Sequence, residues 1–147
     1  MEVLLDPAIE LLGAVDLLGP GKDAPLPAPL QNYARALERA CAPFRTHPAV
    51  TLNARMGESD PDFFQRKDLL LKRSAPPALA FDETMSSCTS EAERSGAWDP
   101  WLAAMRDFAR DSRFPGIFRD AALLLKSELS GLRGHVAKAD FTGKLER

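Results

Sequence analysis

The chain has 147 residues, a formal net charge of −2 at pH 7 and a hydrophobic content of 45%. This length suits a single domain with a core, and the apolar content argues against a disordered chain. The slightly acidic balance gives no general attraction to nucleic acid, and no apolar run approaches the about 20 residues that span a bilayer. We therefore expect one domain over residues 1–147, with neither a nucleic-acid nor a membrane partner.

Three Asp-Pro pairs predict helix starts. Asp6-Pro7, Asp60-Pro61 and Asp99-Pro100 each place a carboxylate at a position that can cap a helix and a proline at the first helical position. Each pair is followed by apolar residues at helical spacing. The sequence therefore predicts a helix after each pair, with Asp6, Asp60 and Asp99 as the capping residues.

The first segment predicts one helix and a linker. Residues 2–5 fit a short strand or an extended lead-in. From Pro7 the apolar spacing predicts a helix that ends at Gly19-Pro20-Gly21, and the proline-rich residues 22–29 predict a linker. Although Lys22 makes the end of this stretch resemble a phosphate-binding loop, Asp23 follows where magnesium needs Ser or Thr. We interpret the stretch as a helix stop.

Three more helices are expected in the next part of the chain. One begins near Leu30 and is ended early by Pro43. A short helix follows His47-Pro48, with Gly57 as its C-cap. Another helix follows Asp60-Pro61.

The remaining chain predicts two longer helices after a loop. Residues 76–85 suggest a brief helical turn, and the polar residues 86–96 predict a loop. One helix begins at Pro100, and a second follows Pro115. Gly131 and Gly134 are expected to close the second helix, and residues 135–147 to form a polar tail.

Strand signals are scarce throughout. The sequence therefore predicts an all-α fold, an irregular bundle of about six helices with room for one short N-terminal strand. The acids Glu2, Asp6 and Glu10 near the start do not fit a secretory signal, which has a basic start and an unbroken apolar run. We expect a cytoplasmic protein, or a secreted one if a signal peptide had been removed. Cys41 and Cys88 are then expected to be free thiols.

The histidines are the first candidates for chemistry. Neither His47 nor His135 has a second potential ligand one helical turn away, and zinc needs three or four converging ligands. We interpret His47, which precedes a proline, as a capping or packing residue, and His135 as a solvated one.

Charged and aromatic stretches also have structural interpretations. Asp107 and Asp111 alternate with arginines, which is typical of the wet face of a helix rather than of an acid–base pair. Arg35, Arg39 and Arg45 form a small basic stripe, which Glu38 interrupts. The aromatic residues are expected to form core between two helices, with a groove for a partner helix as the alternative; they are Trp98, Trp101, Phe108, Phe114 and Phe118. The sequence therefore predicts no catalytic, cofactor-binding or metal-ligating residue, and no cofactor.

The order of several segments resembles the N-terminal part of a bacterial family of unknown function whose longer members resemble zinc metallopeptidases. The matching stretches are Val3-Leu4-Leu5-Asp6-Pro7-Ala8-Ile9-Glu10-Leu11-Leu12, Tyr33, His47-Pro48-Ala49-Val50, Leu79-Ala80, Phe108-Ala109-Arg110-Asp111-Ser112-Arg113-Phe114 and Phe118. The chain departs from the family pattern at Ala8, where a basic residue is expected, and in the proline-rich residues 25–29.

The resemblance implies a role without its own catalytic centre. In that family the His-Glu-x-x-His helix lies downstream of the matched region, so the resemblance carries no catalytic residue to any position here. It implies one of two things: a helical N-terminal domain that supports the catalytic half of a longer protein resembling zinc-dependent peptidases, or a short relative that has lost the metal-binding half. The alternative is a stand-alone helical interaction module that meets another protein through the aromatic stretch or the 86–96 loop. An independent enzyme, based on His47 and scattered carboxylates, is a third hypothesis.

Overall fold

The computed structural model describes residues 5–20, 27–60 and 64–142, and every regular element within these ranges is helical. An isolated bridge between Arg73 and Phe81 is the one β-type pairing in the same ranges. The all-α prediction is therefore confirmed. The strand expected over residues 2–5 falls mostly outside the described residues, and residue 5 itself is not in a strand.

The α-helices are separated by short connections and two 3-10 turns. In chain order the elements are α1 Pro7–Leu17, α2 Ala28–Cys41, η1 Ala42–Phe44, α3 Pro48–Ser59, α4 Phe64–Leu71, η2 Glu83–Cys88, α5 Glu91–Arg94, α6 Asp99–Asp111 and α7 Phe114–Thr142. No helix in the described part of the chain is long and apolar enough to cross a membrane.

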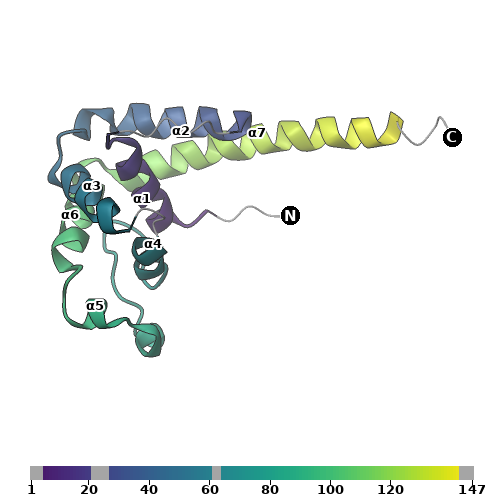
Figure 1. Ribbon diagram of the computed structural model, residues 1–147. Helices are drawn as coiled ribbons and strands as arrows, with labels where there is room; N and C mark the ends of the chain where they lie inside the picture. The colour runs from purple at the N-terminus through teal and green to yellow at the C-terminus, as the bar shows by residue number, and fades with distance from the viewer. Residues whose placement is uncertain (1–4, 21–26, 61–63, 143–147) are drawn as a thin grey trace.

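Helix α1 is the centre of the bundle. It packs closely against α2, α3, α4, α6 and α7, and its Leu11, Leu12 and Val15 are fully buried. Helices α2 and α7 lie side by side in opposite directions, and α7 continues past the start of α2 (Figure 1). An amide hydrogen of Asn32 on α2 is donated to Glu128 on α7 at 2.9 Å.

The aromatic stretch belongs to the core, as the sequence analysis expects. Trp101, Phe108 and Phe114 are almost completely buried. The indoles of Trp98 and Trp101 meet edge to face with 6.0 Å between ring centroids, an arrangement that aromatic quadrupoles favour. This burial removes the alternative in which these rings form an open groove for a partner helix.

The Asp-Pro pairs behave differently from one another. Asp6 caps α1 as predicted, because its Oδ1 accepts hydrogen bonds from the N–H groups of Ala8 and Ile9 at 2.8 and 3.2 Å. The prediction for Asp99 is wrong by one position, since Trp98 is the N-cap of α6 and Asp99 is its first residue. Gly96 makes the turn before α6 with a φ of 76°, a conformation that glycine adopts without strain.

Three predictions for the second half of the chain are also wrong. Helix α7 continues through Gly131 and Gly134 to Thr142, because a glycine within good helix formers costs only about 1 kcal/mol and ends a helix only where the backbone turns left-handed. The predicted turn over residues 76–85 is displaced to η2. The predicted 86–96 loop contains α5, which Ser90 and Glu93 stabilise with a capping box.

We expect the substitution Asp6→Ala to lower the free energy of unfolding by about 1 kcal/mol, because two N–H groups at the start of α1 lose their acceptor. Urea denaturation followed by circular dichroism measures the change. Asp120→Ala is the matched control, since that side chain is mostly exposed on α7. Equal stability of the Asp6 variant and the wild type would contradict the capping role.

Candidate functional site

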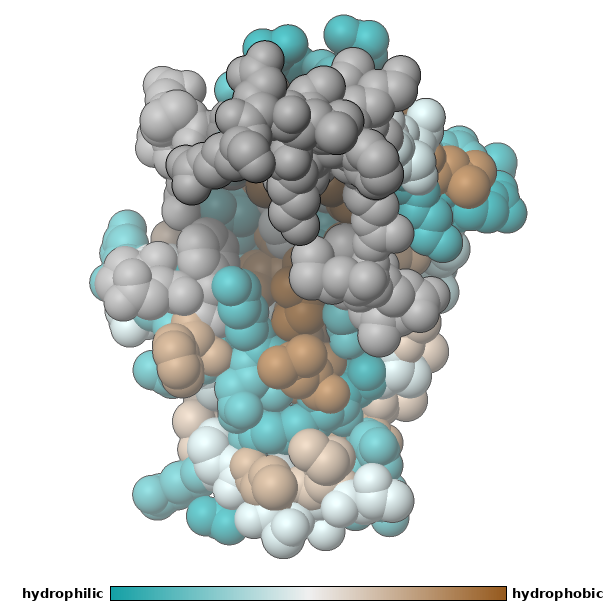
Figure 2. All heavy atoms as spheres, turned by 90° about the vertical axis from the view of Figure 1, so that its right-hand side faces the viewer, coloured by the Kyte–Doolittle hydropathy of each residue, from teal (hydrophilic) through white to brown (hydrophobic). Residues whose placement is uncertain are grey.

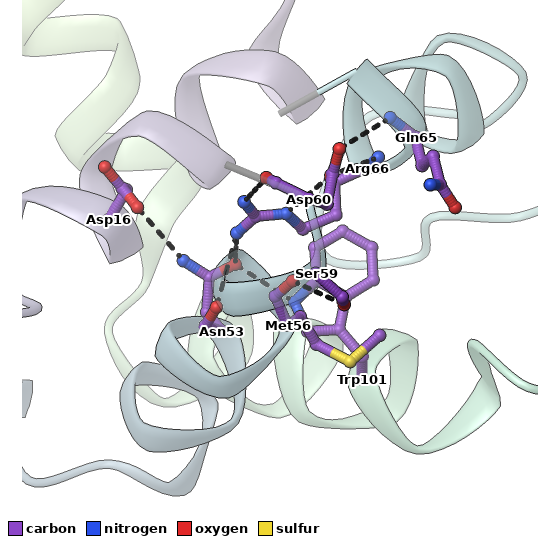
Figure 3. A network of polar contacts seen from close by, with 8 residues as sticks. All are labelled: Asp16, Asn53, Met56, Ser59, Asp60, Gln65, Arg66 and Trp101. Carbon is purple, nitrogen blue, oxygen red and sulfur yellow. Dashed lines mark hydrogen bonds and ion pairs between the residues drawn. The ribbon is translucent and has the colours of Figure 1, made fainter. Parts of the chain in front are cut away.

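Three of the buried polar residues in the described part of the chain, Asn53, Asp60 and Arg66, form one cluster around the Arg66 side chain on α4. The side chain is 1% exposed, and its guanidinium group bonds to two neighbouring residues (Figure 3). Nε donates to the Asp60 carboxylate at 3.0 Å, and Nη2 donates to the Asp60 carbonyl at 2.7 Å. Nη1 donates to the Asn53 side-chain oxygen at 2.8 Å. A buried cation is stable in such a place only when it is paired in this way.

Asp60 connects α3 to α4 through the same contacts. Its carboxylate accepts the backbone N–H groups of Gln65 and Arg66, both at 3.2 Å, so it caps the start of α4 as well as binding the guanidinium group. Burial alone would raise the pKa of Asp60, but the hydrogen bonds and the positive charge of Arg66 outweigh burial and lower it below its usual value. Asp60 is therefore ionised at neutral pH and is not suited to act as a general acid.

Asn53 extends the cluster to α1 and α6. Its side-chain oxygen also accepts the indole N–H of Trp101 at 3.2 Å, and its amide nitrogen lies 3.5 Å from the Asp16 carboxylate. One asparagine on α3 therefore contacts α4, α6 and α1, as the dashed lines in Figure 3 show. A small displacement of any of these helices would break a buried hydrogen bond.

A cavity of about 330 Å³ lies beside this cluster, where the ends of α1 and α3 meet α4. Its lining residues are Asp16, Gly19, Pro20, Asn53, Ala54, Gly57, Glu58 and Arg66. The backbone of α3 passes close to the guanidinium group at Gly57, where a Cβ would lie in ordinary contact with Arg66, 3.5 Å from its Nη2. The volume would suit a small molecule. However, Arg66, Asn53 and Asp16 already interact with other groups of the protein.

A second buried cation, Lys72, follows the end of α4. The side chain is 3% exposed, and Nζ lies 2.8 Å from the Asp68 carboxylate, 3.0 Å from that of Glu93 and 2.8 Å from the Cys88 carbonyl. Burial would lower the pKa of Lys72, but the bonds to the two carboxylates outweigh burial and raise it. A lysine nucleophile needs a lowered pKa, so this ammonium group is suited to structural pairing rather than to covalent catalysis.

The structure places His47 as a cap, in agreement with the interpretation of the sequence. Its Nδ1 accepts the N–H of Ala49 at 3.1 Å, and its Nε2 lies 3.2 Å from the Asp111 carboxylate. The ring also meets Phe108 edge to face. Asp111 is therefore directed to His47 and Asp107 to Arg110, so the two carboxylates do not form a pair.

The remaining candidates from the sequence are the two cysteines, His135 and the Gly21-Lys22 pair. Cys41 is buried, Cys88 is exposed, and both are free thiols as predicted. Burial raises the pKa of Cys41 to about 11, which makes it a poor nucleophile. The side chain of His135 and the pair Gly21-Lys22 lie outside the described residues. Among the residues that the structure describes, no three His, Cys, Asp or Glu side chains come together to hold a metal ion.

The Arg66 cluster is the feature that the sequence analysis missed. Asp60 was assigned a capping role only, and neither Asn53 nor Arg66 belongs to a recognisable motif. Comparisons of this chain with family models, curated proteins and solved structures gave no match.

We expect Arg66→Met to lower the free energy of unfolding by about 3–5 kcal/mol, because it leaves the Asp60 carboxylate buried without its cation. Urea denaturation measures the loss, and Arg119→Met on the exposed surface of α7 serves as the control. The double variant Asp60→Asn, Arg66→Met should lose less stability than the two single changes added together. Simple additivity would show that the two side chains do not interact.

The lowered pKa of Asp60 predicts a specific dependence of stability on pH. A carboxyl group whose pKa is lower in the folded than in the unfolded protein contributes stability above its unfolded value, near 3.8, and loses it as the pH falls toward the folded value. The difference in unfolding free energy between the wild type and Asp60→Asn should therefore be constant near neutral pH and shrink below about pH 4. Urea titrations at a series of pH values measure it, and a constant difference down to pH 2 would exclude this linkage.

Proposed function

We propose that this chain is a helical supporting domain that docks against a second folded unit. The unit we propose is the catalytic half of a zinc-peptidase-like protein, on the basis of the resemblance described above. The chain itself contributes a binding surface and a rigid helical frame. It contributes no group to the chemistry of peptide hydrolysis.

Two exposed apolar side chains on α4 are the observation that carries this proposal. Phe64 is 79% exposed and Leu71 is 61% exposed. They are seven residues apart, which is two helical turns, so they lie on one face of the helix, with the exposed Lys67 and Asp68 between them. Burying two such side chains would contribute about 1.5–3 kcal/mol each to association. Figure 2 shows apolar surface along the middle of the side toward which α7 extends, with hydrophilic surface beside it.

Two buried ionisable groups, Asp60 and Lys72, fit the same proposal. Asp60 remains ionised, Lys72 remains protonated, and both are bonded to their neighbours. Their contacts hold helices together and give neither group the shifted pKa that acid–base catalysis at neutral pH requires. Contacts of this kind fit a supporting role, because that role requires only that the helices keep a fixed arrangement.

The alternative is a stand-alone interaction module that binds a different protein. With the aromatic stretch buried, η2 and α5 are the surface left for this alternative. The exposed Met85 on η2 is the apolar side chain that favours it.

The double substitution Phe64→Ser, Leu71→Ser tests the supporting role. The partner is the polypeptide that the native reading frame encodes after residue 147, produced separately, and calorimetry measures its association with this chain. We expect the double variant to bind at least tenfold more weakly, because the buried apolar area is lost. Leu123→Ser is the matched control, since Leu123 is 62% exposed but lies on α7, and its binding should stay within twofold of the wild type.

Two results would overturn the proposal. A reading frame that stops after residue 147 would leave no catalytic half to support and would favour the interaction module. Unchanged binding of the Phe64 and Leu71 variant would show that α4 is not the docking face. Circular dichroism of both variants should match the wild type, because the substituted side chains are exposed.

A further inference from the structure

Residues 74–97, which we call the 74–97 lobe, stand apart from the bundle. Figure 1 shows η2 and α5 below the other helices, joined to α4 and α6 by extended connections. The closely packed helix pairs of the described chain are formed among α1, α2, α3, α4, α6 and α7 together with η1, and neither η2 nor α5 takes part. The lobe is therefore attached by no helix interface. Its attachments are a backbone bridge between Arg73 and Phe81, a backbone hydrogen bond from Asp82 N–H to the Lys72 carbonyl at 2.8 Å, and individual side chains.

Cations of the bundle form most of the polar attachments. Lys72 binds the Glu93 carboxylate and the Cys88 carbonyl, and it also keeps a contact with Asp68 on its own side of the boundary. Arg106 on α6 donates to the carbonyl groups of Ala78 and Leu79 at 2.9 and 3.1 Å. The fully buried side chain of Leu79 is the main apolar anchor.

The attached position carries unfavourable features at the same boundary. Nε of Arg73 and Oε1 of Glu93 are buried and have no hydrogen-bond partner within the described structure. Leu79 adopts a φ of 44°, in the left-handed region that a leucine rarely occupies. If the lobe separated from the bundle, water would reach both polar atoms and Leu79 could relax. These gains reduce the cost of opening.

The lobe also has internal contacts that would survive separation. Asp82 caps η2 by accepting the N–H of Thr84 at 3.0 Å. Ser90 and Glu93 exchange the hydrogen bonds of a capping box around α5. These bonds lie wholly within residues 74–97, so the short helices do not depend on the bundle for their caps.

We propose that the 74–97 lobe opens from the helical bundle as one unit and that Lys72 is the latch that keeps it closed. Opening breaks the contacts of Lys72 with Glu93 and Cys88, while Asp68 and water continue to solvate the ammonium group. It uncovers the fully buried side chain of Leu79. The bundle formed by the remaining helices stays folded.

Native-state hydrogen exchange, read by mass spectrometry, tests this device in the full chain. The probe of opening is the amide of Asp82, whose hydrogen bond to the Lys72 carbonyl crosses the boundary at 2.8 Å; the amides of Ser74 and Ala97, which bond to Ala80 and Ala92 within the lobe, report whether the lobe stays folded. In the wild type we expect the Asp82 amide to exchange at least tenfold faster than amides of α1 and α6. Lys72→Met should speed the Asp82 amide about tenfold further and leave α1 and α6 unchanged. Lys126→Met, on the exposed surface of α7, should change neither set.

Glu93→Gln provides a second variant that removes the partner charge of the latch and keeps the side-chain size. It should speed exchange in the lobe in the same direction as Lys72→Met. Exchange of the Asp82 amide at the rate of α6 in the wild type would overturn the proposal, because the lobe would then open only with the whole protein. Equal acceleration of lobe and bundle in both variants would also overturn it, since Lys72 would then support the whole fold.

Discussion

The buried guanidinium group of Arg66 is the constraint on which the arrangement of helices depends. A cation that is 1% exposed must have fixed partners, and those partners are Asn53 in the middle of α3 and Asp60, which directly follows α3. The side-chain oxygen of Asn53 also accepts the indole N–H of Trp101, so the same cluster fixes the position of α6. The apolar core would tolerate small shifts between these helices, whereas the charged group does not.

Helix α4 combines two different surfaces in eight residues. One side buries Arg66, Leu69 and Leu70 against the bundle, and the other leaves Phe64 and Leu71 exposed. The buried side explains why so short a helix has a fixed position, because ionic contacts hold its start. The proposed docking through Phe64 and Leu71 benefits from this fixed position, because little conformational entropy is then lost on binding.

The sequence predicted those features that depend on local patterns. The helical class, the cap at Asp6 and the role of His47 follow from spacing and from residues next to prolines. The Arg66 cluster could not be predicted in this way, because Asn53, Arg66 and Trp101 are brought together by tertiary folding from positions far apart in the chain. The continuation of α7 past Gly131 was missed for a different reason: glycine is compatible with a helix interior, and only the backbone conformation decides whether it ends the helix.

The central place of α1 has a consequence for biosynthesis. This helix is translated before the five helices that cover it, and the last of them, α7, begins only at Phe114. At about 5–20 residues per second, α1 leaves the ribosome roughly 5–20 s before its cover is complete. During that interval Leu11, Leu12 and Val15 are available to chaperones and to other nascent chains. A ribosome that stalls before α7 would therefore hold a chain whose central helix lacks the part of its cover that α7 supplies.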